Sequence, residues 1–267
     1  VTAANETTYV DNGLTPDTTY YYRVRGTNLA DASAYSTTAQ ATTTPLPSSL
    51  TWRGGAAANA WDIGGALNWF DGANIVVYSD GANVRFDQSG SNNTPVLLNA
   101  TLQPGSVTVD ANKNYTFNTS GNGSLAGAMR LTKQGSGTLF MNVSNSFSGG
   151  VDINAGTLSL GNVFGAGSGP IRLNGGTLTF AIGGQQFYAN PLVVNAASTL
   201  LSQGGNNNVV SGSWSGNAGA TLIISASGSP GVFSVGGNMS GFPGAVSLGN
   251  SSGTLRINSG NSNVSFG

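Results

Sequence analysis

The sequence contains no cysteine and no histidine, and it has only 9 basic and 10 acidic residues among 267. Without imidazole or thiolate groups the chain lacks the usual metal ligands and the usual bases and nucleophiles near neutral pH. The net charge of −1 provides neither a basic surface for nucleic acid nor a polybasic face for a membrane. We therefore expect no catalytic residue, no metal, no cofactor and no nucleic-acid partner.

Long apolar runs are also missing from this sequence. No stretch approaches the roughly 20 apolar residues of a membrane span, and residues 1–30 lack the basic start and apolar core of a signal peptide. We expect no membrane insertion of this segment. Charged residues make up 7% of the chain, against roughly 25% in ordinary soluble proteins. Solubility must therefore depend on asparagine, serine, threonine and glutamine.

Residues 1–44 differ in pattern from the rest of the chain. Tyr20, Tyr22 and Val24 alternate with polar residues, and this period of two predicts a half-buried strand. The spacing resembles that of the later part of a fibronectin type III domain, carried by Leu14, Pro16, Thr18, Tyr20, Tyr22, Arg23, Val24 and Asn28.

The resemblance to fibronectin type III implies that Tyr20 forms a tyrosine corner, in which its hydroxyl bonds to nearby backbone. A whole domain of this type has about 100 residues and seven strands, so we expect a longer parent polypeptide or a second chain that supplies the missing strands. We interpret residues 1–44 as the C-terminal part of such a spacer domain and residues 45–50 as a linker.

Residues 51–104 begin with a concentration of tryptophans, and two interpretations compete for them. Trp52, Trp61 and Trp69 could form an aromatic platform that binds sugar rings, with Asp62 and Asp71 as polar or acid/base groups. Alternatively, the large rings cap the open end of a repetitive β-structure, and the Asp-Gly pairs form turns between strands. Buried rings would favour the cap, which is the interpretation we prefer.

A short Thr-Leu motif recurs through the remainder of the chain, residues 105–267. Successive copies are 19, 20, 22, 22 and 33 residues apart, with leucines at Leu139, Leu158, Leu178, Leu200, Leu222 and Leu255. A step near 20 residues with one short strand per copy is typical of a β-solenoid, in which each coil stacks on the next. Glycine and asparagine suit the corners, and asparagines can stack in ladders.

One stretch of these repeats also resembles a known family. The segment LTKQGSGTL of residues 131–139, followed by NSFSGG and then by VDINAGTLSLGN, is similar to the autotransporter-associated, or passenger-associated transport, repeat. Phe147 and Val151 replace the tyrosine and threonine usual in that pattern. The resemblance implies a right-handed parallel β-helix in a secreted or surface-exposed bacterial protein, and it implies no particular ligand.

The remaining candidates for chemistry are sparse. Charged residues of the repeat region, Asp110, Lys113, Arg130, Lys133 and Asp152, are scattered at about one per coil, and Lys133 is interpreted as a surface position of the repeat. Phe187 and Tyr188 form a candidate adhesive loop, with a plain insertion between coils as the preferred alternative. The long step before Leu255 suggests a further excursion at residues 227–243.

Together these observations predict an all-β chain: a right-handed parallel β-helix preceded by part of a fibronectin type III sandwich. The expected function is a non-catalytic stalk or fibre segment for display or adhesion, located outside the cell or on its outer surface. The expected partners are chains of the same type placed end to end, adjoining modules of a longer polypeptide, or surface glycans. The alternative is a carbohydrate-binding accessory region of a polysaccharide-degrading enzyme, with Trp52, Trp61 and Trp69 as its contact.

Overall fold

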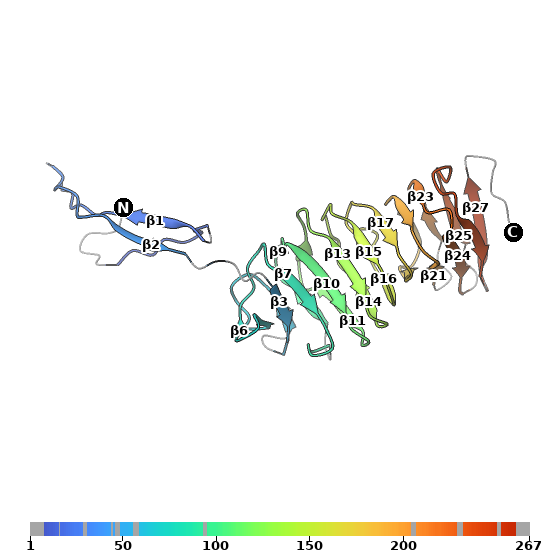
Figure 1. Cartoon of the computed structure of the whole chain (residues 1–267), viewed down its shortest axis with the longest axis horizontal. Helices are drawn as coiled ribbons and strands as arrows, with labels where there is room; N and C mark the ends of the chain where they lie inside the picture. Colours follow the sequence, from blue (N-terminus) through green and yellow to red (C-terminus); the bar gives the residue numbers. More distant parts are fainter. Residues whose placement is uncertain are drawn as a thin grey trace. The chain divides into compact units, whose positions relative to one another are not determined.

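The computed structural model describes residues 8–15, 17–28, 31–43, 45, 49–55, 59–92, 95–203, 207–228, 232–249 and 252–259. All regular elements among these residues are β-strands. The chain divides into two compact units, residues 1–47 and 48–267, which are described separately (Figure 1).

The first unit contains an antiparallel hairpin of β1 (Thr19–Tyr22) and β2 (Ala39–Thr42). The hydroxyl of Tyr20 accepts a hydrogen bond from the amide of Thr15 at 2.8 Å, which is the kind of bond that a tyrosine corner makes. The described residues of this unit form this single two-stranded sheet. The described residues of this unit therefore form a hairpin and not a complete fibronectin type III sandwich.

The second unit is a parallel β-solenoid of about eight turns in its described part, in which each coil adds one strand to each of several stacked sheets. Figure 1 shows these strands side by side, from the cyan to the red end of the chain. The first sheet is formed by β3 (Ser49–Trp52), β7 (Asn83–Phe86), β10 (Ser106–Asp110), β13 (Leu131–Gln134), β15 (Val151–Ile153), β17 (Ile171–Leu173), β20 (Leu192–Val194) and β23 (Trp214–Gly216).

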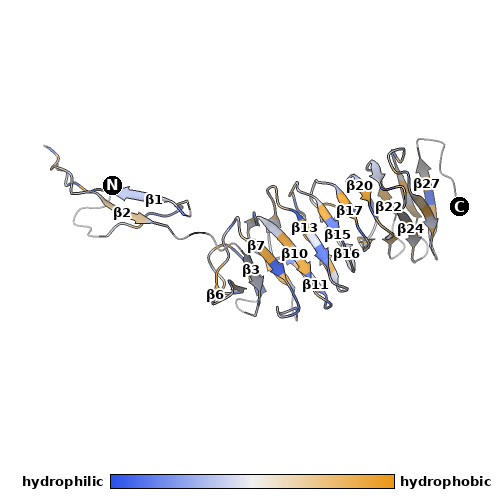
Figure 2. Cartoon of the chain, in the orientation of Figure 1, coloured by the Kyte–Doolittle hydropathy of each residue, from blue (hydrophilic) through white to orange (hydrophobic). Residues whose placement is uncertain are grey.

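The second sheet follows the first after one corner of each coil. Its strands are β4 (Ala60–Trp61), β8 (Val96–Leu98), β11 (Tyr115–Thr119), β14 (Thr138–Met141), β16 (Thr157–Leu160), β18 (Thr177–Phe180), β21 (Ser198–Ser202), β24 (Thr221–Ala226) and β26 (Ala245–Leu248). Alternate residues point inward in both sheets, so the buried side chains form continuous apolar columns. Figure 2 shows the resulting alternation of hydrophobic and hydrophilic residues along strands such as β7 and β15.

The third face of the solenoid is paired only in part. Near its beginning β9 (Thr101–Leu102) pairs with β12 (Ser124–Leu125), and towards its end β19 (Gln185–Tyr188), β22 (Asn207–Val210), β25 (Val232–Gly237) and β27 (Thr254–Ser259) form a four-stranded sheet. Between them, extended backbone still bonds from coil to coil, as in the amide of Ser168 donating to the carbonyl of Phe147.

The strand register confirms part of the expected leucine column and corrects its end. Leu139, Leu158, Leu178 and Leu200 are in register on the second sheet. The next position is occupied by Ile224, because Leu222 pairs with Ser198 two residues earlier in the strand. Leu255 pairs with Phe233 on the third face, so it does not belong to this column.

The corners between the first and second sheets are held by the expected asparagine ladder. The Asn174 side chain donates to Asn154 Oδ1 and the Asn195 side chain donates to Asn174 Oδ1, both at 2.8 Å. Gly156 at the same corner has a positive φ of 62°, and a Cβ there would collide with the carbonyl oxygens of Gly135 and Gly137. Glycine is therefore required both by backbone conformation and by the close approach of the preceding coil.

The first coil is longer than the others because it includes an antiparallel extension. Strands β5 (Trp69–Phe70) and β6 (Ile75–Val76) continue the first sheet beyond β3, with β5 antiparallel to both neighbours. The solenoid thus begins at β3, which spans the end of the expected linker and the start of the region expected to hold the cap and the first strands, and residues 51–104 and 105–267 form one continuous stack.

Candidate functional site

The tryptophans at the beginning of the solenoid lie entirely inside it. Trp52, Trp61 and Trp69 each have 0% of their surface exposed. Trp69 packs edge-on against Trp52 and Trp61, with ring centroids 5.0 and 5.1 Å apart, and Phe86 contacts all three rings. A sugar platform requires at least two ring faces in water, so these residues do not form the carbohydrate contact of the alternative interpretation. They cap the apolar columns instead.

The acidic residues beside the tryptophans are used to shape turns. Asp71 Oδ1 accepts hydrogen bonds from the amides of Asn74 and Ala73, and these bonds hold the pKa of the carboxyl below its ordinary value. Asp62 Oδ1 accepts from the amide of Ala66 at 2.8 Å. Both carboxylates therefore stabilise the loops of the cap.

The two residues of the candidate adhesive loop, Phe187 and Tyr188, point to opposite sides of the strand in which they lie. Residues 185–188 form β19 of the third face, paired in parallel with β22, so they are neither an insertion nor a loop. Phe187 points outward and is 60% exposed, whereas Tyr188 is 2% exposed and its ring lies 4.4 Å from that of Phe180. Tyr188 is thus a core residue, and the prediction that it belongs to an adhesive surface is wrong. Of the excursion expected at residues 227–243, residues 232–237 form strand β25, and residues 229–231 lie outside the described residues.

Three of the scattered charges, Asp110, Arg130 and Asp152, form ion pairs between neighbouring coils on the first sheet, whereas Lys113 donates to the carbonyl of Gly90. Asp152 lies between Arg130 and Arg172, at 3.2 and 3.3 Å, and Arg85 pairs with Asp110 at 2.7 Å. Across the described residues there is no group of three or more acidic, histidine or cysteine side chains placed to bind a metal ion. Nor do those residues include a helix of the length and apolarity needed to cross a membrane.

Lys133 differs from these pairs because its side chain points into the solenoid. It is 0% exposed, and its Nζ donates to the carbonyls of Gln134, Gly135 and Ala155 at 2.5, 2.9 and 3.4 Å. Burial lowers its pKa to about 8. The interpretation of Lys133 as a surface position is therefore wrong, since the ammonium group binds the corner of its own coil and of the next.

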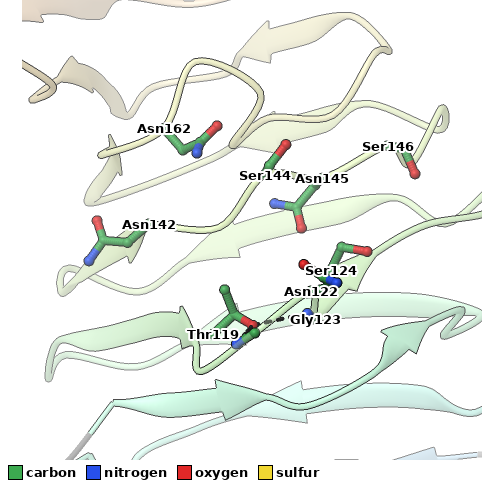
Figure 3. A pocket seen from close by; sticks show the side chains of 10 residues that line it. Thr119, Asn122, Gly123, Ser124, Asn142, Ser144, Asn145, Ser146 and Asn162 are labelled. Atoms are coloured by element: carbon green, nitrogen blue, oxygen red, sulfur yellow. Dashed lines mark hydrogen bonds between the residues drawn. The ribbon is translucent and has the colours of Figure 1, made fainter.

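A polar groove lies at another corner, between the second sheet and the third face. It has a volume of about 440 Å³ and is lined by residues of three consecutive coils, drawn from 119–124, 142–146 and Asn162. Figure 3 shows these side chains rising in three tiers, one tier per coil. None of the lining residues is charged, so the groove can offer hydrogen bonds but no counter-charge. Sequence reasoning missed it, because its residues are ordinary corner types.

The side chains of two lining residues, Thr119 and Asn145, form hydrogen bonds to the backbone around the groove. Thr119 Oγ1 donates to the carbonyl of Leu98 and accepts from the amides of Gly121 and Gly123. Asn145 is 6% exposed and spans three coils: its side chain accepts from the amide of Leu125 and donates to the carbonyls of Val143 and Gly165.

Other groups in the groove retain hydrogen-bonding capacity. Four side chains, those of Asn122, Ser124, Ser144 and Ser146, have no hydrogen bond to another described residue. Asn162 Oδ1 accepts from the amide of Phe164, which leaves its nitrogen available. The groove thus combines a fixed floor with free neutral donors and acceptors.

Comparison with known proteins identifies one part of the chain. Residues 131–160 match the passenger-associated-transport-repeat family, and they cover β13 to β16, the first-sheet and second-sheet strands of two successive coils. No curated protein and no solved structure matches the chain. The match and the β-solenoid together support an autotransporter-type β-helix.

Proposed function

We propose that this chain is a structural, non-catalytic segment of a passenger-type protein that is displayed on the cell surface or secreted. The observation that carries the proposal is the passenger-associated repeat at residues 131–160, which lies in the middle of an uninterrupted parallel stack. On the first sheet, Arg85, Asp110, Arg130, Asp152 and Arg172 are engaged in ion pairs between coils, and Lys133 binds backbone carbonyls. These contacts support a role in holding and presenting rather than in transforming a substrate.

Accessibility on intact source cells tests this proposal. Antibodies raised against the solenoid should label intact cells or detect the protein in the medium, and external protease should remove the label. A cytoplasmic protein of matched abundance serves as the control for lysis. Signal that appears only after the cells are broken would contradict surface display.

We further propose that the solenoid joins neighbouring modules of a longer polypeptide rather than a second chain at its N-terminal end. Buried tryptophans and the antiparallel strands β5 and β6 close that end, whereas end-to-end pairing requires an open strand edge. Electron microscopy of the native full-length protein tests this: isolated stalks are expected, and long fibres with a repeat of one chain length would contradict it.

The hairpin β1–β2 is proposed to belong to a spacer domain related to fibronectin type III. The bond from the Thr15 amide to the Tyr20 hydroxyl and the antiparallel pairing of Tyr20 with Ala41 support this assignment. In the native full-length protein we expect slow amide exchange along β1, as in a closed sandwich. Exchange as fast as in an unstructured peptide would exclude it.

A further inference from the structure

We infer that the polar groove at residues 119–124, 142–146 and 162 is a binding site for a short, uncharged oligosaccharide. Its volume of about 440 Å³ falls within the range of about 300–1,000 Å³ that is usual for small-molecule sites. The inference concerns this groove alone and holds whether or not the chain is displayed on a cell.

The chemistry of the lining selects the class of ligand. Every side-chain polar group in the groove is a hydroxyl or a carboxamide, and each of these can both donate and accept hydrogen bonds. A sugar hydroxyl has the same double character. A charged ligand would lose its hydration without gaining a partner of opposite charge, which is costly. The groove therefore suits neutral sugars better than anionic polysaccharides.

The positions of the free groups suit a ligand that lies along the stack. Asn122 and Ser124 belong to one coil, Ser144 and Ser146 to the next, and Asn162 to the third. Neighbouring strands lie about 4.8 Å apart, so a chain of sugar rings can contact successive coils. Thr119 and Asn145 already hold the groove backbone in place through hydrogen bonds. Binding therefore has to order fewer groups of the protein, which lowers its entropic cost.

An exposed aromatic residue, Phe164, follows the lining residue Asn162 by two positions in the third coil. Phe164 is 60% exposed, its carbonyl accepts from the amide of Asn145, and its own amide is bonded by Asn162. An exposed phenyl ring in this position can pack against the apolar C–H face of a sugar, as aromatic side chains do at wet binding surfaces. In the proposed complex Phe164, although it is not itself a lining residue, provides the aromatic contact that Trp52, Trp61 and Trp69 do not.

Titration of the purified chain with defined oligosaccharides tests the inference. The probes are maltohexaose, cellohexaose, laminarihexaose and mannohexaose, with hexagalacturonate as the anionic comparison, and binding is followed by calorimetry. At least one neutral probe should bind with a Kd below about 1 mM, and hexagalacturonate should bind more weakly. If no neutral probe reaches this affinity, or if the anionic probe binds best, the inference is overturned.

Substitutions then locate the binding. The double variant Asn122→Ala/Ser144→Leu changes two exposed groove positions and should weaken binding about tenfold or more, and Phe164→Ala should weaken it separately. The matched control Thr108→Ala/Thr132→Leu alters two outward positions of the first sheet and should bind like the parent. Circular dichroism verifies that each variant is folded. Unchanged affinity in the folded groove variants would place the sugar elsewhere and overturn the inference.

Discussion

At the scale of single residues, the solenoid depends on a few polar side chains that point inward and bind backbone. Lys133 is the clearest case, because its ammonium group donates hydrogen bonds to three backbone carbonyls at the stacked corners of two neighbouring coils. The sequence alone indicates a lysine at a repeated position but gives no direction for its side chain. A residue beside a corner can reach back to the carbonyls of that corner, and this geometry overrides the usual preference of lysine for solvent.

Lys133 should make the stability of the protein depend on pH between about 8 and 10. Its pKa is about 8 in the folded chain against an ordinary value of 10.5, so the unfolded chain holds this proton more tightly. The free energy of unfolding should therefore rise as the pH increases above about 8. Above pH 10 the buried tyrosines Tyr78, Tyr115 and Tyr188, whose pKa values are raised by burial, should reverse this trend.

The variant Lys133→Met isolates this contribution. It leaves buried carbonyls without their donor, which should lower the free energy of unfolding by about 1–3 kcal/mol at pH 7. It should also abolish the rise between pH 8 and 10, as measured by urea unfolding across that range. Arg130→Gln, at an exposed ion pair, is the control and should retain the rise. A rise that persists in Lys133→Met would assign it to another group.

Asn145 provides a second prediction at this scale. Its side chain satisfies one amide and two carbonyls in the interior, so Asn145→Ala should destabilise the chain by about 2–4 kcal/mol. Asn142→Ala removes an exposed side chain that, among the described residues, bonds only to Asn118, and it should cost less than about 0.5 kcal/mol. Chemical denaturation of the two variants gives the comparison, and equal losses would contradict the assigned role of Asn145.

At the scale of strands, the Thr-Leu motif allowed the second sheet to be predicted but left the third face unseen. Leu139 to Leu200 keep one register because their coils have nearly equal length. β24 contains inward residues at both Leu222 and Ile224, so the motif alone selects the wrong one. β19 and β25 lack the motif and are bounded by glycine and proline, which are typical of loops, and their pairing with neighbouring coils is a long-range effect.

Removal of one complete coil should leave a folded solenoid. Deletion of residues 171–191 brings Leu192 into the place of Ile171 and Thr199 into the place of Thr177. Ile171 and Leu192 each follow a proline, so the new junction keeps the Pro-strand sequence. Since each coil contacts mainly its neighbours, the shortened protein should keep a β-type circular dichroism spectrum and unfold cooperatively, with a modest loss of Tm.

Deletion of residues 171–181 is the matched control for this coil deletion. It removes about half a coil and displaces every later inward residue from its column, so it should abolish cooperative unfolding. If both deletions behave alike, the register of the columns does not determine folding.

At the scale of the whole solenoid, the N-terminal end of the stack carries a cap of aromatic residues and short strands. The N-terminal end is closed by Trp52, Trp61 and Trp69 and by the antiparallel strands β5 and β6. The sequence allowed a cap to be predicted from the concentration of aromatic residues. It did not reveal the antiparallel pairing, because Trp69–Phe70 and Ile75–Val76 are strands of only two residues each.

This cap should keep the solenoid from associating through its N-terminal end. A variant that lacks residues 1–82 exposes the backbone edge of β7 and the apolar ring of Phe86, which the tryptophans cover in the intact chain. Exposed strand edges pair with other chains, so this variant should form oligomers whose mass, measured by light scattering after gel filtration, increases with concentration. A variant that lacks only residues 1–47 retains the cap and should not associate in this way. If the cap-less variant is folded and remains a monomer at the highest concentration reached, the edge is protected by other means and the cap serves stability alone.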